Sequence, residues 1–303
     1  MSWRQLILEA DIEQQEIFED ALLESGAQAV SLEDAGDEPL WEPGPGELPR
    51  WQRARLTGLY HDDDDPLQIF SRLRLALADT PMPECRFTSL EDKDWQRAWL
   101  DHYHPMHFGG RLWICPSHCQ PPDPTAVNVI LDPGLAFGTG THQTTAMCLA
   151  YLAQTPVQGN QVIDYGCGSG ILAVAAARLG AKEVWAVDID PQALTATLNN
   201  AQRNGVADRI HIGKPEDLPD SIKCDLLLAN ILARPLIALA PRLTALLKVG
   251  GALALAGLID EQESSVHNAY YPHIDLKQRD ENERWVLLAG LKVSHNNHDH
   301  PLP

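Results

Sequence analysis

The sequence predicts an α/β protein in which a small ferredoxin-like α+β domain precedes a larger domain built on a parallel sheet. At about 100–200 residues per domain, a chain of 303 residues has room for two. Residues 1–90 read as strand–helix–strand–strand–helix–strand, which is the element order of a ferredoxin-like sandwich. Beyond residue 111 the strands are continuously apolar and alternate with helices, as in a parallel sheet that is buried on both faces.

The first domain is predicted to span residues 1–92. Asp11 is expected to cap its first helix and Gly26 to end that helix, and an acidic run over 62–65 leads into its second helix. The Gly- and Pro-rich stretch 36–50 predicts a loop. The strands are expected over 3–10, 28–34, 53–60 and 85–90, and the helices over 12–25 and 66–78.

Residues 93–110 predict a linker helix and hinge, in which the amphipathic pattern over 94–103 carries aromatic side chains that we interpret as packing groups. The larger domain is predicted over 111–293, and residues 294–303 predict a disordered tail. Its strands are expected over 126–130, 161–165, 183–189, 224–230 and 251–258, its helices over 141–154, 170–179, 191–204 and 234–247, and a late antiparallel edge strand over 284–292.

The charge balance narrows the class of partner. The chain holds 23 basic and 42 acidic residues, a net charge of −19, which disfavours nucleic acid as the main partner because phosphate binding needs clustered cations. Residues 1–100 hold 22 acidic and nine basic residues, a net charge of −13. This excess fits a basic protein partner, and it fits a role in solubility equally well.

Other classes are excluded by what the sequence lacks. No apolar run approaches the roughly 18 residues of a membrane helix, and the N-terminal residues lack the basic region of a secretory signal. The six cysteines form no C-x-x-C pair, which indicates reduced thiols in a cytoplasmic protein. Cys115, His118 and Cys119 have no second ligand pair, so no metal site is expected. We expect a monomer.

The most informative stretch runs from a buried strand through Gly166, Gly168 and Gly170 into a helix. Glycines allow a sharp turn and a close approach of the backbone to a ligand. The spacing is G-x-G-x-G and not the G-x-G-x-x-G of dinucleotide sites, which disfavours a nicotinamide cofactor. Asp164 is expected beside the turn, where its carboxylate favours a ligand with a positive group and no pyrophosphate. S-adenosylmethionine has both an ammonium and a sulfonium group.

Polar side chains end two further strands. Asp188 lies about 20 residues beyond the glycines, where an acid can accept hydrogen bonds from ribose hydroxyls, while Asp190 is the better helix cap. Asn230 closes an apolar strand and is expected to point into the ligand crevice. Phe137, in a glycine-rich loop, offers a stacking face. Either acid of the pair Glu216–Asp217 is expected to touch the adenine edge or to lie in a solvated loop.

Four motifs in this order resemble the PrmA family of ribosomal protein methyltransferases, which belongs to the class I methyltransferase superfamily. They are DPGLAFGTGTHQTT (132–145), VIDYGCGSG (162–170), AVDIDPQA (186–193) and NILA (230–233). The resemblance implies a substrate-recognition domain, a linker and a seven-stranded Rossmann-like catalytic domain. It also implies transfer of several methyl groups from S-adenosylmethionine to the N-terminal α-amine and lysine ε-amines of ribosomal protein L11.

By position in the motifs, the cofactor contacts of that family fall on Thr145, Gly166, Asp188 and Asn230. The residue pattern adds Gly168 and Phe137 to the expected cofactor-binding set. Asn230 and Thr145 are the expected catalytic residues. No metal is expected.

Methyl transfer requires an uncharged amine, and roughly a tenth of an α-amine but only about one lysine in 2,500 is neutral at pH 7. A desolvating pocket raises that fraction. No motif names a strong general base, so the hypothesis is positioning and desolvation, with the Asn230 carbonyl accepting the amine's hydrogens. Two alternatives stay open: a methyltransferase of nucleic-acid bases or glutamine side chains, disfavoured because Asn-Pro-Pro-Tyr is missing at 230–233, and a cofactor-binding regulator without catalysis.

Overall fold

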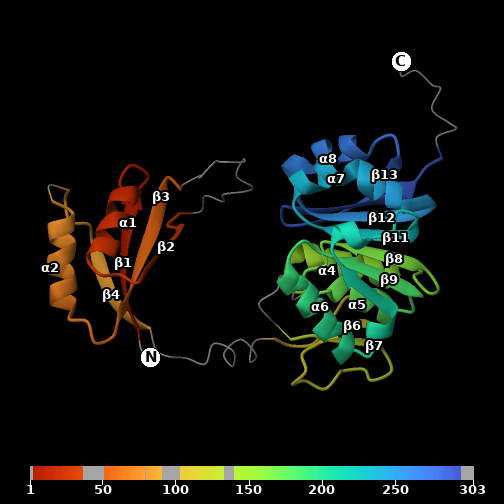
Figure 1. Ribbon diagram of the computed structural model, residues 1–303, viewed down its shortest axis with the longest axis horizontal. Coiled ribbons are helices and arrows are strands. Elements are labelled where there is room, and N and C mark those ends of the chain that lie inside the picture. Colours follow the sequence, from red (N-terminus) through yellow and green to blue (C-terminus); the bar gives the residue numbers. More distant parts are fainter. Residues whose placement is uncertain (1–2, 37–50, 79, 91–102, 133–139, 295–303) are drawn as a thin grey trace, which may run out of the picture. The chain divides into compact units, whose positions relative to one another are not determined.

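The chain folds as two compact units, residues 1–98 and 99–303, in the computed structural model (Figure 1). The predicted loop 36–50, the predicted linker helix and the tail fall wholly or largely outside the described residues. The structure describes residues 3–36, 51–78, 80–90, 103–132 and 140–294.

The first unit is a four-stranded antiparallel sheet with two helices, in the element order strand–helix–strand–strand–helix–strand. The sheet order is β2-β3-β1-β4. The elements are β1 (Trp3–Asp11), α1 (Gln15–Glu24), β2 (Ala29–Asp34), β3 (Arg53–His61), α2 (Pro66–Ala76) and β4 (Cys85–Leu90).

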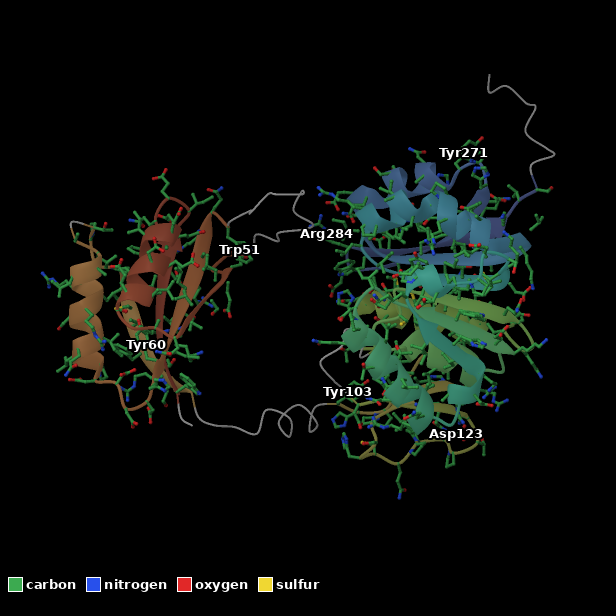
Figure 2. All side chains as sticks on the ribbon, in the orientation of Figure 1. Trp51, Tyr60, Tyr103, Asp123, Tyr271 and Arg284 are labelled. Atoms are coloured by element: carbon green, nitrogen blue, oxygen red, sulfur yellow. The ribbon has the colours of Figure 1, made fainter. Side chains whose placement is uncertain are left out.

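One apolar cluster joins both helices to this sheet, and it includes Phe18 of α1, Ile69 of α2 and Leu6 of β1. The hydroxyl of Tyr60, labelled in Figure 2, is buried with it and lies 2.7 Å from Ser25 Oγ. The Tyr60 hydroxyl therefore has a hydrogen-bond partner where α1 meets the sheet.

The two helix starts differ from each other. Asp65 caps α2 as the acidic run predicts, since its carboxylate accepts from Leu67 N at 3.0 Å. The predicted cap at Asp11 is wrong. Asp11 is the last residue of β1, a turn separates it from α1, and only its backbone carbonyl accepts a hydrogen bond, from Gln14 N. Gly26 follows α1 at φ +107°, as a helix-ending glycine should.

The second unit is built on a seven-stranded sheet in the order β10-β9-β8-β11-β12-β14-β13. The strands from β10 to β12 are parallel, and β14 and β13 are antiparallel to their neighbours. The strands are β8 (Gln161–Tyr165), β9 (Glu183–Val187), β10 (Ile210–Gly213), β11 (Cys224–Asn230), β12 (Leu247–Ile259), β13 (Ile274–Asn282) and β14 (Trp285–Lys292).

Helices cover both faces of this sheet (Figure 1). One face packs α4 (Gln143–Gln154), α5 (Ile171–Arg178) and α6 (Pro191–Arg203), and the other packs α7 (Ala233–Leu246) and α8 (Glu263–Tyr270). Every α5 side chain from Ile171 to Ala177 is buried. The alanines of that helix let it lie close to the sheet, which holds the preceding glycine turn against the strand ends.

Two predictions about strands are wrong. The strand predicted over 126–130 does not join the main sheet: β7 (Val127–Ile130) pairs with β6 (Leu112–Cys115), which pairs with β5 (Met106–His107), in a separate three-stranded sheet. The strand predicted over 284–292 forms and is antiparallel, but β13 pairs with its outer side and is the edge.

The small sheet is joined to α6 by a buried asparagine. Asn204 Oδ1 accepts from Ile130 N at 2.7 Å, and Asn204 Nδ2 donates to Ile130 O at 2.8 Å. Beside it, Arg203 forms an ion pair with Asp132 at 2.9 Å. These contacts fix the point where the chain leaves β7. Among the helices of the described residues, none is long and apolar enough to cross a membrane.

Candidate functional site

The carboxyl ends of β9, β8 and β11 meet where the strand order reverses, and ligands of open α/β sheets bind at such a point. A cavity of about 590 Å³ lies there, a volume typical of a small-molecule site. Its lining residues are His142, Thr144, Tyr165, Gly166, Gly168, Val187, Asp188, Ile189, Pro215, Asn230, Ile231, Leu232, Pro235, Leu239, Gly257 and Trp285.

The glycine turn has a backbone that only glycine adopts easily. Gly166, Gly168 and Gly170 have φ angles of +81°, +54° and +74°. A Cβ built on Gly166 would lie well under 3.0 Å from Ile231 Cγ2, and one on Gly170 would meet Thr197 at 2.7 Å. The turn is thus closely packed against two neighbouring segments, and its exposed side faces the cavity at Gly166 and Gly168.

Helix α6 holds the carbonyl groups of this turn. Thr197 Oγ1 donates to Gly168 O at 3.1 Å, and Asn200 Nδ2 donates to Ser169 O at 2.8 Å. Both α6 side chains are buried. Because its carbonyls are bound from the side of α6, the turn is preorganised without any ligand.

Asp188 follows β9 and lines the cavity next to the turn. Its carboxylate accepts from Gly168 N at 2.9 Å and from Asp190 N at 3.0 Å. The cap of α6 is Asp190, which accepts from Gln192 N at 2.9 Å. The carboxylate of Asp188 is therefore not used as a helix cap, and its remaining lone pairs are available to hydroxyl donors of a ligand.

Asn230 is the last residue of β11, and it lines the same cavity. Its Nδ2 donates to Thr145 Oγ1 at 3.2 Å, so its Oδ1 is the amide atom left to accept from a ligand. Thr145 is 1% exposed and stands behind Asn230, outside the set of lining residues. The structure thus joins the two predicted catalytic residues in one contact.

The interpretation of Asp164 as a carboxylate facing a cation is wrong. Asp164 is 1% exposed and does not line the cavity, and its Oδ2 accepts from Ala173 N at 3.0 Å, within the first turn of α5. Burial raises the pKa of its carboxyl group to about 7, with a smaller contribution from Asp188. Asp164 therefore stabilises the first turn of α5, which follows the glycine turn.

Glu216 and Asp217, expected either to touch the adenine edge or to lie in a solvated loop, do not line the cavity. Asp217 accepts from Lys214 N at 2.7 Å, and Glu216 is paired with the Lys214 ammonium, while Pro215 between them does line the cavity. Phe137 lies outside the described residues. Among those described, no group of three or more His, Cys, Asp or Glu side chains is placed to hold a metal ion.

Several cavity residues, among them Gly257, His142 and Trp285, were not predicted from the sequence. Gly257 bends β12 at φ +89°, and a Cβ there would overlap the backbone of Ile231. His142 caps α4, and its Nδ1 accepts from Thr144 N; burial lowers the pKa of this imidazole, so the ring is neutral at pH 7. Trp285 packs edge-to-face on His142 with ring centroids 4.9 Å apart. The only advance signal was that His142 belongs to the motif over 132–145.

A second cavity of about 620 Å³ is lined by residues of the loop between Thr155 and Asn160 and by the first part of β12, from Lys248 to Ala252. It lies at the amino ends of β8 and β11, where Asp225 accepts from Gln161 N and pairs with Lys248 at 2.7 Å. It contains no part of the glycine turn and neither Asp188 nor Asn230. The cavity at the carboxyl ends is therefore the candidate functional site.

A family model described as ribosomal protein L11 methyltransferase (PrmA) matches residues 2–292. The chain belongs to this family. The prediction of a protein methyltransferase with a class I fold is thereby confirmed. L11 methyltransferases of this family use S-adenosylmethionine as the methyl donor.

Individual L11 methyltransferases show how far the likeness extends. The protein from Marinobacter nauticus is 49% identical over 296 residues, which are 96% of this chain and 99% of that protein. That from Pseudomonas aeruginosa strain LESB58 is 49% identical over 293 residues, with the same coverage. The crystal structure of the ribosomal protein L11 methylase from Lactobacillus delbrueckii subsp. bulgaricus is 35% identical, with a TM-score of 0.58, over 63% of this chain and 100% of that one.

The described residues fit this methyl donor. The crowded glycine turn leaves room for a ligand only on its cavity side, the Asp188 carboxylate lies beside it, and the cavity is large enough for a nucleoside joined to an amino acid. The exposed side chain of Ile189 adds an apolar surface next to Asp188. These are the groups that a ribose and a purine require at adjacent positions.

Proposed function

We infer that this chain transfers methyl groups from S-adenosylmethionine to amines of ribosomal protein L11, namely the N-terminal α-amine and lysine ε-amines. The observation that carries the proposal is the position of Asn230. Its amide ends β11 inside the cavity and is oriented by Thr145, with the carbonyl oxygen left to accept hydrogen bonds. L11 is proposed as the partner because the relatives are L11 methyltransferases.

The donor would be held by the end of the cavity near β8 and β9. Gly166 and Gly168 approach its amino acid portion, and Asp188 accepts hydrogen bonds from its ribose. Phe137 stays a predicted stacking partner. S-adenosylmethionine, when bound, supplies a methyl group on a positively charged sulfur that a nitrogen lone pair can attack.

The other end of the cavity would receive the amine. Among the described lining residues Asp188 is the only one with an ionised side chain, because burial keeps His142 neutral. An amine that enters next to Asn230 therefore meets no carboxylate to stabilise its charged form, and desolvation lowers its pKa. Asn230 Oδ1 accepts one N–H of the neutral amine and so directs the lone pair toward the methyl group.

Thr145 would act through Asn230. Its buried hydroxyl accepts from Asn230 Nδ2 at 3.2 Å, which fixes the rotation of the amide and presents Oδ1 to the cavity. This makes Thr145 a positioning residue. Direct contact of Thr145 with the cofactor is a separate prediction, implied by the family resemblance.

Replacing Asn230 tests the proposal. We expect Asn230→Ala to lower kcat at least about tenfold, or about 1.4 kcal/mol in barrier height, with the affinity for S-adenosylhomocysteine within threefold of the wild type. Asn199→Ala, on the exposed face of α6, is the matched control and should leave both unchanged. A kcat for Asn230→Ala within about threefold of the wild type refutes the role of Asn230.

The first unit is proposed as the recognition domain for this partner. The net charge of −13 over residues 1–100 attracts a basic ribosomal protein and speeds association at low ionic strength. An association rate that does not change with salt concentration would leave this charge as a solubility feature. A ribosomal partner implies that the reaction takes place in the cytoplasm.

A methyl-transfer assay decides between catalysis and cofactor binding alone. Purified chain, tritiated S-adenosylmethionine and unmethylated ribosomal proteins are incubated together, and the labelled protein is identified by mass. We expect label in L11. Label in another ribosomal protein but not in L11, or binding of the donor without transfer, contradicts the proposed function.

A further inference from the structure

The cavity extends along the sheet edge past Asn230, to strands that the proposed donor site does not use. From the β9 end it is lined by Asp188, Gly166, Asn230, Gly257 and Trp285, which come from five neighbouring strands or strand ends. Neighbouring strands are about 4.8 Å apart, so β14 lies about 10 Å beyond β11. Because β14 is antiparallel, its first residue reaches the edge where the parallel strands end.

Trp285 is fixed at this edge from two sides. Its backbone pairs with Ile259 of β12, and its ring packs on His142, the residue that caps α4. The turn before it is also anchored: Gln143 Nε2 donates to Glu283 Oε2 at 3.1 Å, and Arg284, labelled in Figure 2, pairs with Glu261. An indole held in this way is a permanent part of the cavity wall.

Asn230 can assist only some of the methyl transfers proposed above. In each transfer the nitrogen lone pair forms a bond to the methyl carbon while the carbon–sulfur bond breaks, and its electron pair stays on sulfur. The first two products lose a proton to water before the next transfer. The dimethylated amine has no N–H left, so Asn230 Oδ1 has nothing to accept in the third transfer, and the product keeps its positive charge.

The described cavity wall beyond β11 holds no carboxylate that stabilises such a cation. An aromatic face does so, and tryptophan is the most effective ring for quaternary ammonium groups. We propose that Trp285 is a specificity-determining residue that stabilises the methylated ammonium and thereby carries each amine to the trimethylated state. This inference rests on the proposed amine methylation and adds the residue that determines how many methyl groups each amine receives.

The test follows the number of methyl groups on unmethylated L11 by intact-mass spectrometry over time, with saturating S-adenosylmethionine. We expect Trp285→Leu to lower the ratio of the third to the first transfer rate about tenfold, with mono- and dimethylated protein accumulating. Trp285→Phe, which keeps an aromatic face, should stay within threefold of the wild-type ratio. A merely structural role would slow all transfers equally and leave the ratio unchanged.

Trp113→Leu is the matched control, because Trp113 also packs on a histidine, His107 at 4.6 Å, but lies in the small sheet and outside the cavity lining. Folding of each variant is checked by its binding of S-adenosylhomocysteine. Should Trp285→Leu not fold, Trp285→Met keeps the bulk without the ring and gives the same comparison.

An unchanged ratio in the Leu or Met variant, or an equal loss in Trp285→Phe, overturns the inference. Absence of methyl transfer by the wild-type chain would instead refute the proposed function, so the two failures are distinguishable.

Discussion

Gly166→Ala is the substitution whose cost can be worked out most directly from the structure. Two separate effects oppose it. The residue has φ +81°, which costs an L-amino acid about 1–2 kcal/mol. The new Cβ would also overlap Ile231 Cγ2, and relieving such overpacking costs about 1–3 kcal/mol. We expect the free energy of unfolding of the second unit to fall by about 2–5 kcal/mol.

The two effects can be measured apart. Gly159 has φ +80° and no heavy atom within 4 Å of the position of an added Cβ, so Gly159→Ala reports the backbone cost alone. In Gly166→Ala/Ile231→Ala the Cγ2 atom is removed, and the nearest remaining atom, Ile231 Cβ, lies at an ordinary 3.7 Å. The double variant should therefore regain about 1–3 kcal/mol relative to the sum of the single variants.

The assay is urea unfolding followed by circular dichroism, together with calorimetric binding of S-adenosylhomocysteine. Gly166→Ala should weaken this binding at least tenfold, because the turn that faces the cavity is displaced. If Gly166→Ala costs no more stability than Gly159→Ala, or if Ile231→Ala does not relieve it, the steric argument for this glycine is wrong.

Two further predictions concern buried polar groups. Because the pKa of Asp164 is about 7 in the folded chain and about 3.9 when unfolded, the folded state binds the extra proton, and stability falls as pH rises between these values. Asp164→Asn should abolish about 2 kcal/mol of the loss between pH 5 and pH 8 in urea unfolding; equal slopes for both proteins contradict this. Asn204→Leu leaves both backbone groups of Ile130 unpaired and should cost about 2–4 kcal/mol, against about 0.5 kcal/mol or less for the exposed Asn199→Leu. Comparable costs for the two leucine variants would show that the buried pairing is not needed.

The strands whose side chains are buried on both faces were predictable from sequence, because their apolar runs have no competing interpretation. β8 and β11 have the predicted bounds, Gln161–Tyr165 and Cys224–Asn230. β13 was not predicted because seven of its nine residues, IDLKQRDEN, are polar or charged. Such a composition is typical of an edge strand. Sequence also does not tell which sheet a short strand joins, so β7 was assigned to the wrong one.

The residues of the site likewise divide into those that the sequence predicts and those that it does not. Gly166, Asp188 and Asn230 were predictable because each ends or follows a parallel strand, and parallel strands bring such ends to one edge. Asp164 belongs to the same motif, but it alternates along β8 with Ile163 and Tyr165, so its side chain faces α5 instead of the cavity. Trp285 enters through an antiparallel strand late in the chain, and no local pattern predicts that contact.

Ile231 lies next to both Gly166 and Gly257, and it therefore limits how far this pocket can be remodelled for bulkier donors. Its side chain occupies the space next to Gly166, and its main chain occupies the space next to Gly257. Trimming Ile231 opens room at the first glycine, whereas no replacement of Ile231 opens room at the second. Engineering can therefore widen the pocket beside Gly166 through the side chain of Ile231, whereas beside Gly257 the limit is set by the backbone.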